Sequence, residues 1–306
     1  MAASPTNDTY APRGGVRLTL HVRRSISLVG VPLALCGCGG GTGGPAGGDV
    51  GGAQPPPGPH VWYRPTVETT WQWQLQPGAD GRINTGYDVD VYDIDLFDSD
   101  PAVVAGLQAS GRNVICYFSA GSFEDFRSDA GAFLAEELGN PLEGFPDERW
   151  LDIRSDNVRR IMLLRLDLAV QKACDGVEPD NMTGFANDTG FDLTADDQLA
   201  YNRFIADAAH ERGLAVGLKN DLDQVVDLVD SFDFSVNEQC HEFDECDLLL
   251  PFIDAGKPVF NAEYDTRFIT DEHLRSGMCA DALALGLRTL VLPVALDDSV
   301  RFSCDR

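Results

Sequence analysis

The sequence predicts an α/β protein whose folded part is a closed (β/α)8 barrel, the TIM-barrel fold. Short apolar or β-branched runs alternate with stretches whose apolar residues recur at helical spacing, which indicates parallel strands joined by helices. Eight such runs in roughly 240 residues match the strand number of this barrel. The runs lie at residues 70–76, 91–97, 113–119, 176–180, 215–220, 234–239, 258–264 and 289–295.

The stretches between these runs carry helix start and stop signals. Ser155 can cap a helix whose apolar residues follow at helical spacing. Thr194 opens another helix, Asp197 completes a capping box three positions later, and Gly213 follows the end of that helix. Further helices are predicted at 101–110, 221–231, 244–255 and 271–286.

Two segments match a regular barrel less well. Residues 77–90, between the first two strands, are rich in turn-forming residues, and residues 121–154 are longer than a standard loop. A doubly wound open sheet is therefore the alternative fold. That alternative lacks the glycine fingerprint expected after its first strand.

The N-terminal residues carry signals of export. Arg23 and Arg24 precede an apolar run that is too short to span a bilayer, and the run ends in LCGC, which resembles a bacterial lipobox. We therefore expect residues 1–38 to be a lipoprotein-type signal peptide of a protein exported from a bacterial cell, with Cys38 lipidated and anchored to the membrane. Ordinary signal cleavage and secretion is the alternative.

Residues 39–59 form a Gly- and Pro-rich run with almost no apolar side chains. This composition predicts a disordered linker. Its glycines do not form a nucleotide-binding loop, because no strand precedes them and no helical pattern follows. The folded domain is therefore expected to span residues 60–306.

The composition is strongly acidic. The 306 residues carry a formal net charge of −26 at pH 7, and such a surface repels nucleic acid and anionic lipid. The same surface would attract a polycation, whereas solubility in an exterior compartment is the simpler explanation. We expect no nucleic-acid partner, and contact with a membrane only through the lipid anchor.

Six cysteines follow the signal segment, an even number that favours disulfides in an exported protein. Cys240 and Cys246 flank a short acidic loop and form the first predicted pair. Cys279 and Cys304 form the second pair, which would tie the C-terminal tail to the domain.

The other possible metal ligands do not form a recognisable site. Cys116 and Cys174 lie in or beside apolar strands and are expected to be buried thiols. The chain contains no CxxC, HxH or HxxxH pattern. Neither a metal ion nor another cofactor is therefore expected.

Polar side chains gather where the predicted strands end. The carboxyl ends of barrel strands carry the active site, and a packed core would not hold so many acids and amides without partners. Their coincidence at one rim therefore predicts a functional site. These residues are Gln74, Gln76, Asp93, Asp95, Asp98, Tyr117, Ser119, Glu178, Asp180, Asn181, Lys219, Asn220, Asp221, Asn237, Glu238, Gln239, Glu263, Tyr264 and Asp265.

Each of these residues also has a structural explanation when it is taken singly. Asp93 and Asp95 could face outward on an amphipathic strand, and Glu263 could support a neighbouring side chain. Lys219 could form a structural salt bridge with Glu178 or with Glu238. Because Glu178 and Asp180 stand two apart, they share one strand face, with Glu178 deeper in the barrel.

The chemistry available to this rim is limited. The chain has no GxSxG elbow and no P-loop. Carboxylates, amides and aromatic rings such as Trp73 and Tyr117 remain. These groups are typical of glycoside hydrolysis, in which one protonated acid serves the leaving oxygen and one ionised carboxylate serves the anomeric carbon or a water molecule.

Longer motifs follow one another from about residue 62 to the C-terminus. In order they are WQWQLQ, VYDIDLFD, VICYFSAGSFEDFR, DERWLDIRS, CDGVEPDN, DQLAYNRFIADAAHERGL, VGLKND, FDFSVNEQC and KPVFNAEY. Together they resemble the glycoside hydrolase family of endo-α-1,4-polygalactosaminidases. The resemblance implies a single catalytic (β/α)8 domain that cleaves α-1,4-linked galactosamine polymers.

The resemblance also implies roles for individual residues. Asp180 in VEPDN would be the nucleophile and Glu238 in VNEQC the acid/base of a retaining enzyme. Thr183 and Phe185 stand where an Asp and a Tyr are expected, so sugar contacts there are expected to differ. The expected substrate-binding residues are Trp73, Asp93, Asp95, Tyr117, Glu178, Asn181, Lys219, Asn220, Asn237, Glu263 and Tyr264.

The expected partner is a galactosamine-rich polysaccharide, which is cationic where it is de-N-acetylated, and the protein is expected to be a monomer. Two alternatives stay open. One is a non-catalytic barrel that binds surface carbohydrate, and the other is a glycosidase for another α-linked amino sugar or a galactan.

Overall fold

The computed structural model describes residues 61–305. The predicted signal segment 1–38 with Cys38, and the predicted linker 39–59, lie outside these residues. None of the helices within 61–305 is long and apolar enough to cross a membrane.

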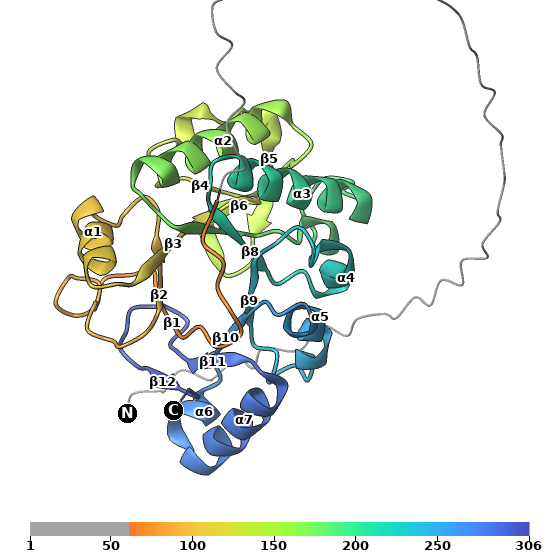
Figure 1. The fold of residues 1–306 in the computed structure, drawn as a ribbon. Helices are drawn as coiled ribbons and strands as arrows, with labels where there is room; N and C mark the ends of the chain where they lie inside the picture. Colours follow the sequence, from red (N-terminus) through yellow and green to blue (C-terminus); the bar gives the residue numbers. More distant parts are fainter. Residues whose placement is uncertain (1–60, 306) are drawn as a thin grey trace, which may run out of the picture. The chain divides into compact units, whose positions relative to one another are not determined.

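The predicted strands form one curled parallel sheet, which confirms the α/β class (Figure 1). Neighbours in the sheet follow the order β1-β2-β3-β7-β8-β9-β10-β11, and each neighbouring pair is parallel. The strands are β1 (Trp71–Gln74), β2 (Val91–Asp95), β3 (Asn113–Ser119), β7 (Gly176–Asp180), β8 (Ala215–Lys219), β9 (Phe234–Glu238), β10 (Val259–Glu263) and β11 (Arg288–Val291).

The helices lie around the outside of this sheet (Figure 1). Ser155 caps its helix as predicted, and Thr194 forms the capping box with Asp197. The α-helices are α1 (Pro101–Ala109), α2 (Asp156–Gln171), α3 (Ala195–Glu211), α4 (Val225–Leu228), α5 (Leu250–Asp254), α6 (Thr266–Thr270) and α7 (Glu272–Leu285). The 3-10 turns are η1 (Ala130–Ala132), η2 (Ala135–Glu137), η3 (Gly184–Ala186), η4 (Leu222–Gln224) and η5 (Cys246–Leu249).

Two predicted helices are shorter than expected. The stretch 221–231 begins with Asp221 in the left-handed region at φ 53°, so the helical turns start only after it. The stretch 244–255 is divided into η5 and α5. Pro251 lies in the first turn of α5, where a proline starts a helix more readily than it continues one.

The interior of the curled sheet is filled by one apolar cluster. It joins side chains from strands far apart in the sheet, and the rings of Trp71 on β1 and Phe260 on β10 stack at 5.1 Å. Gly217 makes room for this filling, since a Cβ there would lie 2.3 Å from the Phe234 ring. The cluster also contains Val91, Ile115, Ala215, Val236, Ala262, Leu290 and Leu292.

The sheet differs from a regular closed barrel at its seam. No ladder joins β1 to β11 within residues 61–305, and the C-terminal segment lies at this position. Strand β12 (Phe302–Ser303) pairs antiparallel with β11, while Arg301 donates hydrogen bonds to the side chain of Gln72 and to the carbonyl of Trp71. The C-terminal segment therefore connects the two edges of the sheet.

The unexpectedly long stretch 121–154 contains a small antiparallel sheet. Its strands are β4 (Ser122–Glu124), β5 (Leu138–Leu142) and β6 (Phe145–Leu151), in the order β4-β6-β5. This insertion sheet follows β3 directly, at the carboxyl end of the main sheet. It therefore places its residues close to the rim where the polar side chains were predicted.

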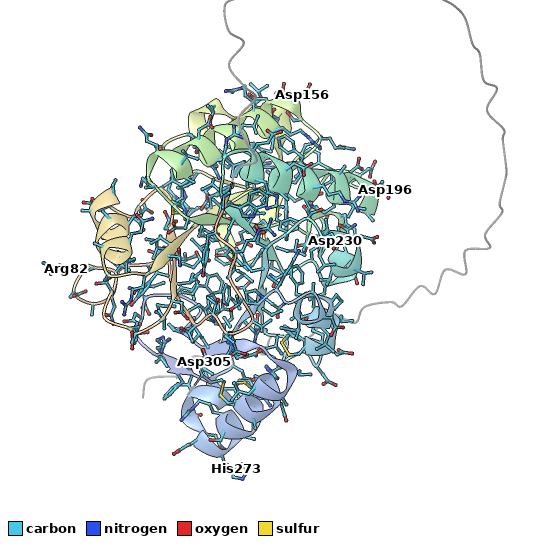
Figure 2. The ribbon with its side chains drawn as sticks, viewed as in Figure 1. Arg82, Asp156, Asp196, Asp230, His273 and Asp305 are labelled. Atoms are coloured by element: carbon cyan, nitrogen blue, oxygen red, sulfur yellow. A yellow bond between two sulfur atoms is a disulfide. The ribbon has the colours of Figure 1, made fainter. Side chains whose placement is uncertain are left out.

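Three disulfides cross-link the domain, visible among the side chains in Figure 2. The predicted pairs Cys240–Cys246 and Cys279–Cys304 are confirmed. The prediction that Cys116 and Cys174 are buried thiols is wrong, because these residues form the third disulfide. Cys116 lies on β3 and Cys174 lies two residues before the start of β7, and these two strands are neighbours in the sheet.

Candidate active site

Lys219 lies at the centre of the candidate active site. It is the last residue of β8, and its side chain is only 2% exposed. Its Nζ lies 3.1 Å from Glu178 Oε1, 3.1 Å from Asp180 Oδ1 and 3.5 Å from Glu238 Oε2. Burial opposes the charge on the ammonium, but the three carboxylates outweigh burial and raise the pKa of Lys219, so Lys219 stays cationic.

Two acids form the floor of the site. Glu178 and Asp93 are both buried inside the curled sheet, close to Lys219. Burial raises the pKa of Glu178 to about 7, while Lys219 opposes the shift. Burial and the adjacent charge of Glu178 raise the pKa of Asp93 well above its usual range, so Asp93 keeps its proton beside Glu178.

Asp180 is held from both of its oxygens. Its Oδ2 accepts from the Tyr117 hydroxyl at 3.0 Å, and its Oδ1 accepts from the backbone amide of Asn181 at 2.6 Å as well as contacting Lys219. Burial raises the pKa of Tyr117 well above its usual value, so the phenol keeps the proton that it donates. These contacts fix the carboxylate at the end of β7.

Glu238, at the end of β9, is held in a similar way. The hydroxyl of Tyr264 donates to its Oε1 at 2.6 Å, and the amide of Asn220 donates to its Oε2 at 3.1 Å. Asn220 also accepts from the Glu238 backbone amide at 2.9 Å and from the Asn237 side chain at 3.2 Å. Asn220 therefore fixes both the backbone and the side chain of Glu238.

A cavity of about 400 Å³ opens at this cluster. Asp180, Glu238 and Lys219 line one part of it, and the ammonium of Lys219 lies 4.8 Å from the centre of the Trp73 ring. Exposed apolar side chains complete the lining. These are Phe126, Phe145 and Val294, with 59%, 52% and 68% of their surface exposed.

Some predicted substrate-binding residues are held by other protein groups or lie outside the cavity lining. Asp95 lines the cavity, but both of its oxygens accept from Arg127. Asn181 donates to the hydroxyl of Ser119 at 2.9 Å. Glu263 is fully buried and accepts from the His241 backbone amide at 2.9 Å, away from the cavity lining.

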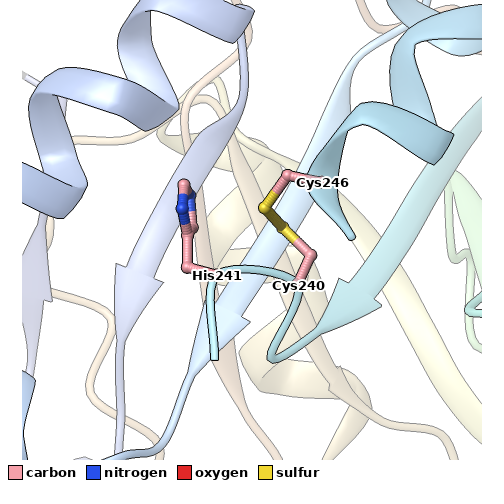
Figure 3. Close-up of side chains that lie close together, drawn as sticks. All are labelled: Cys240, His241 and Cys246. Carbon is pink, nitrogen blue, oxygen red and sulfur yellow. A yellow bond between two sulfur atoms is a disulfide. The ribbon is translucent and has the colours of Figure 1, made fainter. Parts of the chain in front are cut away.

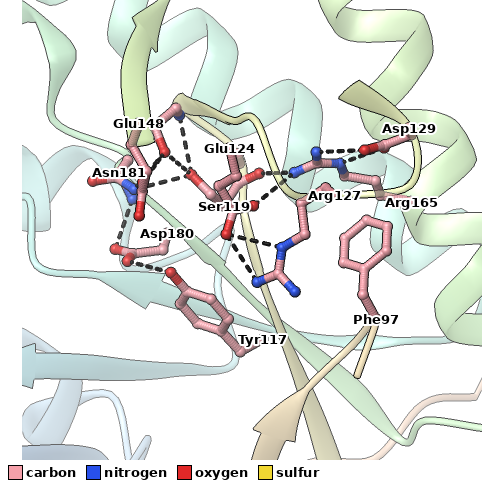
Figure 4. A network of polar contacts seen from close by, with 12 residues as sticks. Phe97, Tyr117, Ser119, Glu124, Arg127, Asp129, Glu148, Arg165, Asp180 and Asn181 are labelled. Atoms are coloured by element: carbon pink, nitrogen blue, oxygen red, sulfur yellow. Dashed lines mark hydrogen bonds and ion pairs between the residues drawn. The ribbon is translucent and has the colours of Figure 1, made fainter. Parts of the chain in front are cut away.

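Three carboxylates in the cavity lining, Glu124, Asp147 and Glu148, were not predicted from the sequence. Glu148 on β6 lines the cavity, and its Oε2 accepts from the Ser122 hydroxyl at 2.6 Å (Figure 4). Figure 4 shows Glu148 beside Asn181 and Asp180. The unusual length of the stretch 121–154 and the motif DERWLDIRS, which contains Glu148, were signals from this segment, but neither assigned a role to this acid.

Cys240, His241 and Cys246 place three potential metal-ligand atoms within 4.8 Å of one another (Figure 3). The two sulfur atoms are bonded to each other as a disulfide, so neither is a thiolate. This grouping is therefore a cross-linked turn after β9 and lacks the ligands that a thiolate metal site requires.

The arrangement provides two partly exposed carboxylates, Asp180 and Glu238, on either side of one buried ammonium. The side chains of these acids are 19% and 28% exposed, whereas that of Glu178 is fully buried. A ligand in the cavity could reach both Asp180 and Glu238. Two such carboxylates can supply the nucleophile and the proton donor that glycosidic bond cleavage needs.

Comparison with known proteins agrees with this chemistry. A family model for the glycoside-hydrolase family GH114 matches residues 52–306. Aspergillus fumigatus Ega3, solved in complex with galactosamine, is 41% identical with a TM-score of 0.75 and covers 80% of this chain and 98% of its own. The glycoside hydrolase domain of PelA from Pseudomonas aeruginosa shares the fold, with a TM-score of 0.58 at 16% identity over 76% of this chain and 97% of its own. No curated protein sequence matches the chain.

Proposed function

Because the chain belongs to glycoside hydrolase family GH114, we propose that it is an endo-α-1,4-polygalactosaminidase, which cuts within chains of α-1,4-linked galactosamine. One observation carries the proposal. Asp180 and Glu238 both contact the ammonium of Lys219 at the mouth of a cavity, in a chain 41% identical to a protein solved with galactosamine.

The proposed reaction is a double displacement with retention. Asp180 attacks the anomeric carbon and forms a glycosyl ester while the glycosidic C–O bond breaks. Glu238 gives its proton to the leaving oxygen, then takes a proton from the water that hydrolyses the ester. Free Asp180 and protonated Glu238 are regenerated, so the reaction consumes only water and one glycosidic bond.

The spacing of the two acids supports retention. Asp180 Oδ1 and Glu238 Oε2 lie 3.1 and 3.5 Å from one ammonium, so they cannot be farther apart than these two contacts placed end to end. That limit accommodates the ~5–5.5 Å between the carboxyl groups of retaining enzymes. The limit applies to this one pair of oxygens and also meets the lower end of the ~6.5–9.5 Å range of inverting enzymes, so the configuration of the first product decides between the two mechanisms.

The charge of the protein supports a cationic substrate. The net charge of −26 attracts a polysaccharide whose amino groups are protonated. We further propose that the protein acts outside the cell as a monomer, exported through residues 1–38 and anchored at a lipidated Cys38. Labelling with a radioactive fatty acid, lost in a Cys38→Ala variant, would test the anchor.

Digestion of defined oligosaccharides tests the proposed function. The purified protein should shorten α-1,4-linked galactosamine oligomers, as read by mass spectrometry, and the first product should have the α configuration by NMR. Asp180→Asn and Glu238→Gln should each lower kcat by on the order of 10³-fold or more while the protein stays folded by circular dichroism.

Other outcomes would point to other functions. Saturable glycan binding without new reducing ends would favour a carbohydrate-binding barrel. Cleavage of neutral galactans but not of galactosamine oligomers would assign a different substrate. If both variants cut as fast as the parent, the assignment of the catalytic pair is wrong.

A further inference from the structure

The carboxylates that line the cavity differ in their cationic partners. Asp180 and Glu238 contact Lys219, while Asp95 and Glu124 bind Arg127 at 2.7 and 2.8 Å. Asp147 and Glu148 line the same cavity, yet no Lys, Arg or His of residues 61–305 lies within ion-pair distance of either. Asp147 is exposed to solvent, whereas Glu148 is half-buried. An unpaired carboxylate in such a place is expensive unless a ligand supplies the charge.

The position of Glu148 is fixed by the insertion sheet. Glu148 on β6 stands opposite Glu124 on β4 in the ladder between these strands, and the Oε2 atom of Glu148 accepts from the Ser122 hydroxyl. That hydroxyl lies 2.6 Å from Ser119 Oγ and 3.2 Å from Asn181 Nδ2. Glu148 is thus connected through two serines to the residue that follows Asp180 (Figure 4).

The surroundings of Glu148 favour a cation. Burial raises the pKa of Glu148 to about 7, and the charges of Glu124 and Asp180 act in the same direction while Arg127 opposes them. A bound ammonium would reverse this balance, because it stabilises the ionised carboxylate directly. A neutral group in the same place would bury the carboxylate further and leave it without a partner.

We propose that Glu148 binds the protonated 2-amino group of a sugar unit in the cavity and so selects de-N-acetylated over N-acetylated units. This inference rests on the proposed function. An N-acetylated unit carries no positive charge at C2, so it cannot pair with Glu148. A charge-assisted hydrogen bond of this kind changes affinity by roughly tenfold to hundredfold.

The Glu148→Gln variant tests this inference, because the amide keeps the shape of the side chain and can still accept from Ser122. The value of kcat/KM is measured on matched de-N-acetylated and N-acetylated galactosamine oligomers. The parent should prefer the de-N-acetylated oligomer, and the variant should lose roughly tenfold or more of that preference, mainly through KM. Asp207→Asn is the matched control, since it removes an exposed charge on α3 outside the cavity lining and should leave the preference unchanged.

Two further measurements separate the possible outcomes. Glu148→Asp keeps the charge and should keep part of the preference, so equal loss in both variants would refute a role for the charge. An unchanged ratio in Glu148→Gln, or a parent without any preference, would also overturn the inference while cleavage itself stands. Calorimetric binding of galactosamine and N-acetylgalactosamine to parent and variant gives the same comparison without turnover, and failure of the parent to cut either oligomer would instead overturn the proposed function.

Discussion

Two buried clusters of charged side chains, one around a lysine and one around two arginines, are built in different ways. In the lysine cluster, the ammonium of Lys219 on β8 contacts Glu178 and Asp180 on β7 and Glu238 on β9, its two neighbouring strands. In the arginine cluster, two guanidinium groups use their flat, forked donors to hold the insertion sheet (Figure 4). The arginine cluster comprises Arg127 and Arg165 with Asp95, Asp98, Glu124 and Asp129.

The difference between the clusters lies in the exposure of their carboxylates at the cavity and in geometry. Lys219 is outnumbered by three carboxylates, two of which are open to the cavity. Arg165 instead makes paired bonds of 2.8 and 2.9 Å to Asp129 and donates to the Ser119 carbonyl at 2.6 Å. Partly exposed carboxylates at a cavity suit chemistry, whereas paired and directional bonds suit the anchoring of a segment.

The largest expected effect is on activity, from Lys219→Met. Without the ammonium, Glu178, Asp180 and Glu238 repel one another, which favours protonation of the proposed nucleophile. We expect kcat/KM to fall by on the order of 10²–10³-fold. Lys172→Met is the matched control, because Lys172 binds the backbone carbonyls of Phe97 and Ser99 instead of cavity carboxylates, and this variant should stay within about twofold of the parent. Parent-like activity of the Lys219 variant would remove the distinction between the clusters.

The next effect is on stability, from Arg165→Met. Removing a buried guanidinium leaves Asp129 without its partner and Glu124 with Arg127 alone, so the free energy of unfolding should fall by about 3–5 kcal/mol in urea titrations. The folded variant should keep kcat/KM within about tenfold of the parent, because Arg165 does not line the cavity. Arg203→Met removes an exposed arginine and serves as the control. A loss of activity as severe as that of the Lys219 variant would show that the arginine cluster also positions the reacting groups.

Local patterns were sufficient to predict the lysine cluster. Each strand run could be read from its own apolar residues, and parallel pairing brings the strand ends to one rim, which placed Asp180, Lys219 and Glu238 together. The alternation of side chains along a strand separates two residues that the sequence analysis placed in one binding site. Because Glu263 and Tyr264 are adjacent on one strand end, they cannot share a face, and only Tyr264 lines the cavity.

The arginine cluster and its surroundings could not be predicted in the same way. They depend on contacts between segments far apart in the chain, such as Arg165 with Asp129, and on the insertion sheet, whose short strands carry no clear periodicity. The disulfide between Cys116 and Cys174 spans 58 residues and forms only because β3 and β7 become neighbours. The role of Glu148 could not be predicted because this residue lies on the insertion sheet, whose position depends on these long-range contacts.

Glu263 extends the comparison to a buried acid that has no cationic partner within residues 61–305. Burial raises its pKa to about 7 from a usual value of 4.5, against the hydrogen bonds from Asn261 and His241. Below about pH 4.5 the carboxyl is protonated in the folded and unfolded states, so its ionisation does not affect stability. As the pH rises toward 7 the unfolded chain ionises first, so this group makes the folded protein progressively less stable.

The smallest expected effect is therefore a change in pH dependence, from Glu263→Gln. The parent should lose on the order of 2–3 kcal/mol of unfolding free energy relative to this variant between pH 5 and pH 8, because the amide does not ionise. Urea titrations of both proteins at the two pH values measure the difference, and Glu211→Gln, an exposed acid at the end of α3, should show almost none. A constant stability difference between parent and Glu263→Gln at the two pH values would mean that Glu263 ionises as readily in the folded protein as in the unfolded chain. Burial without a cation would then not disfavour the ionised form of Glu263 in the folded protein.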